Sequence, residues 1–276
     1  MTFRDIPLLA IVLLLPVLIC GIFGPLLVPH NPANVNPDES MKPPSWITGE
    51  GWSHVFGTDS LGRDVLSRVI AGAQATLIVS LLGVVLAGAL GILLGLLAAY
   101  FGGWLDIVIM RTVDIQMSIP GTLLALLISA SLGAGLSTIV AVIAIVFWTQ
   151  YARVVRGETL SLKQKDFVLM AQVLGGTPAR ILRRHIFPNI IDSALVVATL
   201  QLGVAVMLEA ALSFLGLGVQ PPSVAWGKMI AESRLYIATA WWLPVFPGLA
   251  ILMTVLGANL LGDWLRDRFD PKLRQL

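Results

Sequence analysis

The uncharged stretch from 69 to 105, VIAGAQATLIVSLLGVVLAGALGILLGLLAAYFGGWL, decides the fold class of this chain. It fills the gap between Arg68 and Asp106, and charge is likewise absent between Asp114 and Arg153 and between Arg234 and Asp263. A helix that crosses a bilayer needs about 20 predominantly apolar residues. Each gap is therefore long enough for at least one membrane span.

The composition extends this conclusion to the whole chain. Hydrophobic residues make up 57% of the sequence and charged residues only 12%, and the mean hydropathy is +0.86. A soluble domain carries about 25% charged residues. The sequence therefore predicts an all-α, polytopic membrane protein with six transmembrane helices, near 7–28, 76–99, 105–128, 137–155, 192–214 and 245–262.

The first apolar run is expected to be a retained span. It extends from Ile6 to Val28, whereas the apolar part of a signal peptide has about 7–15 residues, and no small-x-small cleavage site follows it. The single Cys20 cannot form an intrachain disulfide, and the lack of any CxxC pair or Cys/His cluster gives no support to zinc or redox chemistry.

The positive charges predict the orientation. The region 153–190 holds seven Lys and Arg residues and the C-terminal tail holds four, whereas 29–74 holds three and 215–244 holds two. Cytoplasmic loops carry the excess of Lys and Arg, so the first two regions are predicted to be cytoplasmic. With six spans, both termini are then cytoplasmic.

The two external regions are expected to differ in structure. The 29–74 segment is irregular and ends, from Asp64, in the apolar spacing of a short amphipathic helix. The 215–244 segment is rich in glycine and proline and then in aromatic residues that suit a membrane–water interface. These are Trp226, Tyr236, Trp241 and Trp242.

Several residues inside the spans indicate close packing or buried charge. Gly91-Ile-Leu-Leu-Gly95 permits close approach of another helix. Arg111 and Asp114 share a face of the third span, as an internal pair or as part of a pathway. Glu209 needs either a structural partner across a helix interface or a place along a pathway. Pro120 is expected to kink or interrupt the third span.

The loop 157–190 is the most informative cytoplasmic segment. A short helix is predicted from Asp166 to Leu174, and Gly175-Gly176 ends it because glycine readily adopts the left-handed conformation. A second short helix is predicted from Pro178, stopping before Pro188. Such an apolar protrusion either binds a partner or folds back onto its own bundle.

This loop resembles the cytoplasmic signature of permease subunits of binding-protein-dependent ABC importers. The signature begins with a Glu-Ala-Ala-type triplet, which is followed by three residues and a glycine. Nine residues after the glycine comes a short segment that ends in Leu-Pro. Here the triplet position is Leu169-Met170-Ala171, and Gly175 and Pro188 fall in register. The triplet keeps only its last alanine, and Phe187 replaces the leucine.

Further segments resemble one permease type of the dipeptide/oligopeptide/nickel importers. They are Phe56 to Arg68, Phe214 to Pro222 with Trp226-Gly227, Phe246-Pro247-Gly248, Asn259 to Asp263, Leu265-Arg266-Asp267 and Asp270-Pro271. The resemblance covers nearly the whole chain. It implies the type I permease fold with a cytoplasmic coupling helix, divided into 1–28 (N-terminus and first span), 29–74 (periplasmic), 75–270 (permease core) and 271–276 (tail).

The resemblance also implies a function and partners. This chain would form half of the path for di- or oligopeptides in the bacterial inner membrane, beside a second homologous permease. A periplasmic or lipid-anchored binding protein would deliver the solute, and two ATP-binding subunits would hold ATP and Mg. No role for nucleic acid is implied. The contact with the ATPase is expected at Asp166, Phe167, Leu169, Met170, Ala171, Leu174, Gly175 and Gly176.

The chain itself is expected to hold no cofactor and no catalytic or metal site. The phosphate-binding Gly-x4-Gly-Lys-Ser/Thr loop is absent, so this chain is not expected to hydrolyse ATP. Externally, Asp59 and Asp64 suit caps of turns and of a helix start, and the functional alternative is that Asp59, Arg63 and Asp64 contact the binding protein. His54 alone is not a metal site.

Three alternatives remain open. A nickel importer of the same family is the nearest. An ATP-independent carrier or channel would show inverted repeats with interrupted helices, which the sequence does not reveal. An intramembrane enzyme would need paired catalytic groups, and the spans contain no such motif.

Overall fold

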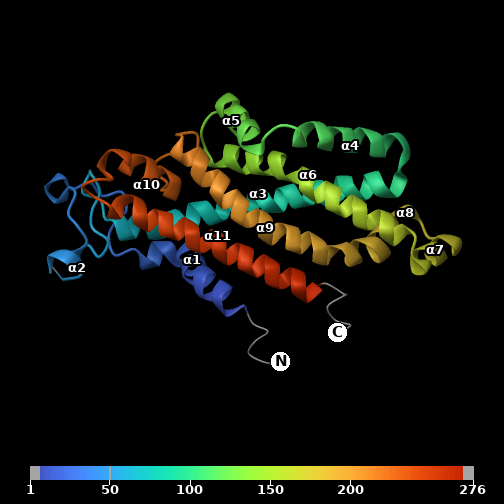
Figure 1. The fold of residues 1–276 in the computed structure, drawn as a ribbon, viewed down its shortest axis with the longest axis horizontal. Coiled ribbons are helices and arrows are strands. Elements are labelled where there is room, and N and C mark those ends of the chain that lie inside the picture. The colour runs from blue at the N-terminus through green and yellow to red at the C-terminus, as the bar shows by residue number, and fades with distance from the viewer. Residues whose placement is uncertain (1–6, 50, 270–276) are drawn as a thin grey trace.

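The computed structural model describes residues 7–49 and 51–269, which form helices and loops without a β-strand (Figure 1). Within these residues, five helical segments are long and apolar enough to cross a membrane. They are α1 (Leu8–Leu27), α3 (Val65–Phe101), α6 (Leu136–Lys163), the segment Pro178–Phe214 that includes α9 (Phe187–Phe214), and α11 (Trp242–Phe269). The predicted tail 271–276 and the Asp270-Pro271 match lie outside the described residues.

The predicted third span is a broken one. It consists of α4 (Gly103–Met117) and α5 (Gly121–Leu132), which meet at an angle of 92°, and counting this pair as one span gives six. The break ends at Pro120, immediately before α5. Proline has no N–H to continue a helix, and it disfavours the helical conformation of the residue before it. The sequence therefore located the interruption correctly.

The centre of the bundle is the contact between α3 and α6. A Cβ atom at Gly91 would lie 2.3 Å from the carbonyl oxygen of Trp148, and one at Gly95 would lie 2.7 Å from that of Ala152. Only glycine allows the two backbones to come this close. The partner of the predicted GxxxG is therefore α6 of the same chain.

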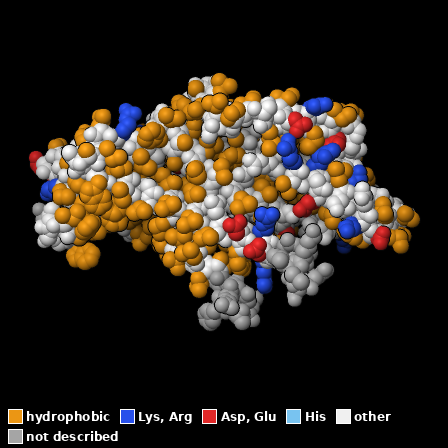
Figure 2. Space-filling model, in the orientation of Figure 1, with side chains coloured by type: hydrophobic (Ala, Val, Ile, Leu, Met, Phe, Trp, Pro, Cys, Tyr) orange, Lys and Arg blue, Asp and Glu red, His pale blue; other side chains and the backbone are white. Residues whose placement is uncertain are grey.

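The remaining long helices surround this pair. α9 packs against α3, α6 and α11, and α1 lies against α3 and α11 (Figure 1). One face of α1 is exposed and apolar, with Leu26 84% and Ile22 66% exposed. Hydrophobic side chains cover much of the surface in Figure 2, as expected for helices that face lipid.

The two ends of the long axis carry the shorter elements (Figure 1). At one end, called the α2 end, lie η2 (Pro37–Glu39), α2 (Ser45–Thr48), α10 (Trp226–Ser233) and η4 (Arg234–Tyr236). At the other, the α7 end, lie α7 (Asp166–Val173), α8 (Pro178–Ile181) and the π-helical turn η3 (Leu182–Ile186).

Two predictions about the α2 end are wrong. The residues after Asp64 are not a separate amphipathic helix but the first turns of α3, which continues for 37 residues. Trp226 and Trp242 do not face an interface, because they are only 1% and 5% exposed. Their indole nitrogens donate to the carbonyl oxygens of Val69 (2.9 Å) and Thr58 (3.2 Å), which fastens α10 to the start of α3 and α11 to the loop before it.

Candidate functional site

The protrusion at the α7 end has the predicted glycine cap. α7 ends at Val173, Gly175 has φ +78°, and the Gly176 N–H donates to the carbonyl oxygen of Ala171 at 2.9 Å. This left-handed cap turns the chain back toward the bundle. Thr177 then caps α8, accepting a hydrogen bond from the Arg180 N–H at 3.4 Å.

The second short helix does not stop before Pro188 as predicted. α8 continues through η3 directly into α9, and Pro188 occupies the first turn of α9. The wider π-helical turn immediately before it accommodates the ring and the missing N–H of the proline. The protrusion is thus continuous with a membrane helix on its C-terminal side.

α7 has one buried side and an apolar outer side. Val168 is fully buried in a cluster that includes Val155 of α6 and Ile190 of α9. On the outer side Met170, Val173 and Leu174 are 65%, 82% and 86% exposed. Figure 2 shows hydrophobic side chains at this end of the molecule. The protrusion is therefore attached to its own bundle but does not bury its tip there.

The structure places all eight predicted coupling residues on this single helix and turn. Phe167 and Leu169 are each 44% exposed, Asp166 is exposed in the first turn, and Ala171 is half-buried against the cluster around Val168. Gly175 and Gly176 form the cap. Five apolar side chains of this segment are exposed, and together we call them the α7 tip: Phe167, Leu169, Met170, Val173 and Leu174.

The expected pair of Arg111 and Asp114 is replaced by pairs between helices. Asp114 accepts from Arg153 of α6 at 2.8 Å, and Asp106 accepts two hydrogen bonds from Arg156 of α6 at 2.6 Å each. Arg111 lies exposed on α4. The acidic side chains of α4 therefore hold the first half of the broken span against α6, a role that spacing along one helix could not reveal.

A cavity of about 470 Å³ lies beside the break between α4 and α5. Its lining combines apolar side chains such as Phe147 and Met207 with four uncharged polar ones. Gln116 is held in place by a bond from its amide nitrogen to the carbonyl oxygen of Ile145 (2.7 Å) and one from the Trp148 indole (2.9 Å). The four polar side chains are Gln116, Thr122, Thr149 and Gln150.

Sequence reasoning missed this cavity because it looked for charged groups in the spans. The sequence did contain a weaker signal for the cavity than charge would be. Uncharged polar residues lie on either side of the break at Pro120 and on the next span. Irregular backbone at membrane depth is tolerated only where protein buries it or where it lines a cavity. The broken span could therefore have pointed to these residues.

Glu209 does not line this cavity, although its neighbours Leu208 and Ala211 do. Its carboxylate is completely buried and accepts hydrogen bonds from the hydroxyls of Thr76 on α3 (3.1 Å) and Ser213 on α9 (2.6 Å). This geometry corresponds to the structural alternative, a partner across a helix interface.

The comparison with known families identifies this architecture. The sequence model of the family described as "Binding-protein-dependent transport system inner membrane component" matches residues 91–275, a region that contains the broken span, the cavity and α7. The chain belongs to this family. It is therefore a membrane-spanning permease component of ABC importers.

Curated relatives of this permease component match it over almost its full length. A di/tripeptide transport system permease of Pseudomonas aeruginosa is 42% identical over 95% of this chain and 86% of its own length. A dipeptide transport system permease of Alkalihalophilus pseudofirmus is 40% identical over 98% and 87%. A glutathione transport system permease of Escherichia coli is 41% identical over 93% and 83%.

The family assignment also corrects an argument made from the sequence. Interrupted helices were expected of ATP-independent carriers, yet this permease component has one in α4 and α5. A broken span therefore does not separate the two classes. The family match, rather than the continuity of the helices, decides between them.

At the α2 end of the permease component, the candidate contacts for a binding protein have partners inside the chain. Asp59 accepts from Arg63 at 2.7 Å and from Arg68, and both arginines also bind Glu232 of α10, at 3.0 and 2.9 Å. Asp59 and Asp64 also serve as caps: Asp59 accepts from the N–H of Leu61 and Arg63, and Asp64 from that of Ser67. Two large apolar side chains at this end, Trp52 and Leu235, are 88% and 81% exposed.

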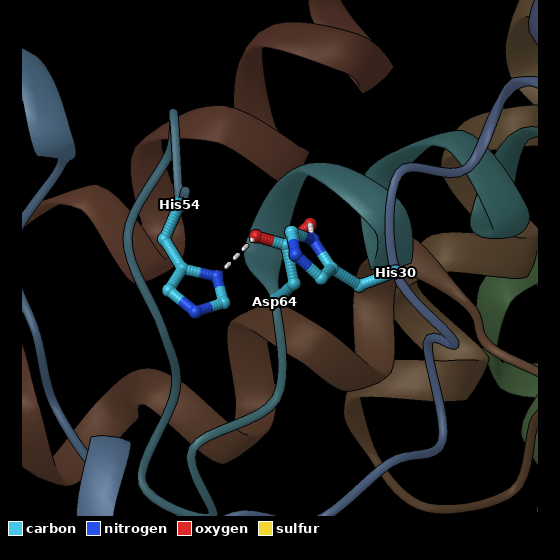
Figure 3. Close-up of side chains that lie close together, drawn as sticks. All are labelled: His30, His54 and Asp64. Carbon is cyan, nitrogen blue, oxygen red and sulfur yellow. Dashed lines mark hydrogen bonds and ion pairs between the residues drawn. The ribbon is translucent and has the colours of Figure 1, made fainter. Parts of the chain in front are cut away.

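Asp64 also brings two histidines together at the α2 end. Figure 3 shows His54 pointing at its carboxylate, with Nδ1 2.9 Å from Oδ1, and the ring of His30 beside them. The expectation of no metal site considered His54 alone. The structure adds His30 and Asp64, and one donor atom from each of the three residues lies within 4.8 Å of the others.

Proposed function

We propose that this chain forms half of the translocation path of an ATP-driven importer for di- or oligopeptides. A second, homologous permease supplies the other half, an external binding protein delivers the peptide, and two ATPase subunits supply the energy. The chain is not catalytic and binds neither ATP nor Mg itself. The observation that carries this proposal is the exposed α7 tip on a segment that is anchored in the bundle.

The α7 tip supports docking of a partner because its apolar side chains are exposed at one end of the molecule. Leu174 and Val173, at the end of α7, are more than 80% exposed, and α7 lies at one end of the long axis of the molecule (Figure 1). Apolar side chains gathered in this way mark an interaction site. The sequence has no phosphate-binding loop of its own, so an ATPase subunit is the partner that an importer needs here.

The orientation follows from the same assignment. The α7 end, with its seven Lys and Arg residues between 153 and 190, faces the cytoplasm, as do both termini. The α2 end, with 29–74 and α10, faces the binding protein. The membrane is the bacterial inner membrane.

The cavity beside the broken span favours a peptide over a metal ion as solute. Its lining residues include four uncharged polar side chains and no His, Cys, Asp or Glu. Amide side chains both donate to and accept from peptide groups. Nickel and related ions prefer imidazole, thiolate or carboxylate ligands. The relatives named for di- and tripeptide transport agree with this choice.

The test of the proposal is the substitution Leu174→Ser, with Leu235→Ser as the matched control. Both leucines are over 80% exposed, but they lie at opposite ends of the molecule. Burying a leucine stabilises a contact by roughly 1.5–3 kcal/mol, so Leu174→Ser should weaken ATPase binding by about one to two orders of magnitude. The readouts are co-purification of the ATPase subunits and uptake of a labelled dipeptide by cells.

The control variant should retain the ATPase subunits. If Leu174→Ser keeps wild-type ATPase binding and dipeptide uptake, the docking assignment is wrong. If ATPase binding is lost from Leu174→Ser, and wild-type cells accumulate nickel rather than peptide, the coupling stands but the proposed solute does not.

A further inference from the structure

The imidazole of His54 lies between two carboxylates. Its Nδ1 is 2.9 Å from Asp64 Oδ1, and its Nε2 is 3.2 Å from Glu39 Oε2. A neutral imidazole has one N–H and therefore donates to only one of them. With the proton on Nε2, directed at Glu39, the lone pair of Nδ1 faces the Asp64 carboxylate, and a cation between them removes the repulsion.

His30 adds a third donor on the open side of this pair. Its ring centroid is 4.9 Å from that of His54, and its Nδ1 is 3.7 Å from Asp64 Oδ2. That distance is too long for a hydrogen bond. In Figure 3 the ring of His54 points at the Asp64 carboxylate, and the ring of His30 overlaps the same carboxylate. The side chain of His30 is 44% exposed, so it can adjust and leaves access from solvent.

We propose that His30, His54 and Asp64 bind a divalent transition-metal ion of the Zn²⁺ type. Two imidazoles and one carboxylate are ligands that such ions accept, whereas Ca²⁺ and Mg²⁺ prefer oxygen alone. Ligand atoms at about 2.0–2.1 Å from a tetrahedral ion lie about 3.3 Å apart. The Nδ1–Oδ1 distance of 2.9 Å needs only a small increase, and water fills the fourth position.

Glu39 supplies the outer support that such a site needs. A metal-bound histidine almost always donates its other N–H to a carboxylate or carbonyl, which fixes the tautomer. Glu39 already occupies that position on His54, and Lys42 holds Glu39 in turn at 3.2 Å. Asp64 is also fixed, since its Oδ2 accepts from the backbone N–H and the hydroxyl of Ser67.

The ion would connect three points that are distant in sequence. His30 follows the end of α1, His54 lies in the loop after α2, and Asp64 is the N-cap of α3. The site lies at the α2 end and shares no residue with the lining of the cavity beside the broken span. Its role is therefore to fix the segment between the first two membrane helices, not to carry the solute.

The test is a Zn²⁺ titration of the full chain, purified without a histidine tag. The sequence has three histidines, and His185, on η3 at the opposite end, is the matched control. The wild type and His185→Gln should bind one equivalent of Zn²⁺ in competition with a chelating dye, and both should gain thermal stability. His30→Gln should bind at least about tenfold more weakly and gain none.

Glu39→Gln provides a second variant that keeps all three ligands. It should weaken Zn²⁺ binding by about 10–100-fold. The proposal is overturned if the wild type binds no stoichiometric Zn²⁺, or if His30→Gln binds as tightly as the wild type. An unfolding temperature of His30→Gln equal to that of the wild type without Zn²⁺ shows that the variant is folded, so its loss of binding is attributable to the ligand.

Discussion

The contact between α3 and α6 provides the most direct test of the fold. We predict that Gly91→Ala destabilises the protein, whereas Gly88→Ala, one turn earlier on the same helix, does not. A Cβ at Gly91 would lie 2.3 Å from the carbonyl oxygen of Trp148 and 2.5 Å from Cβ of Tyr151. At Gly88 the nearest atom, in the Tyr151 ring, would be 3.4 Å away, an ordinary contact.

The difference in stability can be worked from these distances. The Gly91 Cβ falls short of an ordinary 3.4 Å contact by about 1.1 Å, and its nearest neighbour is backbone, which no rotamer change can move. Overfilling a packed interior costs about 1–3 kcal/mol. Alanine is favoured over glycine inside a helix by about 1 kcal/mol, and this gain is common to both variants. Gly91→Ala should therefore be less stable than Gly88→Ala by about 1–3 kcal/mol.

The assay is thermal unfolding of the two variants in the same detergent. For a chain of this size, each kcal/mol shifts the unfolding temperature by about 2–4 °C, so Gly91→Ala should unfold roughly 2–12 °C below Gly88→Ala. Equal unfolding temperatures for the two variants would refute the intrachain α3–α6 contact at Gly91. The glycine pair would then be explained by contact with another chain.

Two further predictions concern polar side chains. Glu209→Leu should lower the unfolding temperature, because Thr76 and Ser213 lose their buried acceptor at about 1–3 kcal/mol each, and Glu209→Gln should lower it less. Hydrogen bonds from Lys42 and then from His54 lower the pKa of Glu39. A lowered pKa stabilises the fold above the ordinary value of 4.5, and this stabilisation is lost as the pH falls through the lowered value. The difference in unfolding temperature between wild type and Glu39→Gln should therefore shrink below pH 4.5.

The features of the fold that depend on residues close together in the sequence could be predicted from the sequence alone. The spans followed from charge-free lengths, the break from Pro120, and the cap of α7 from Gly175. Asp64 as an N-cap followed from residue type and position. Each of these features depends on backbone geometry within a few residues, and the types of those residues largely determine that geometry.

Features that join distant segments could not be predicted in this way. Asp114 has a neighbour of opposite charge three residues away, yet its partner is Arg153 on another helix. Trp226 is of a residue type that is common at membrane–water interfaces, yet its indole is buried against α3. The histidine cluster joins positions 30, 54 and 64. In each case the deciding contact comes from packing between helices and loops, which spacing along one segment does not contain.

The packing of α7 suggests how a docked ATPase would act on the path. Val168 lies in one buried cluster with Val155 of α6 and Ile190 of α9, and these two helices also line the cavity beside the broken span. Under the proposed coupling, a displacement of the α7 tip therefore reaches both helices through this buried cluster. Val168→Ala removes two buried carbon atoms, at a cost of about 2 kcal/mol, without changing the tip. It should retain ATPase binding and reduce dipeptide uptake, whereas Leu174→Ser should lose both. Wild-type uptake by a Val168→Ala variant that still binds the ATPase would place the transmission elsewhere, in the continuous helix from α8 through η3 into α9.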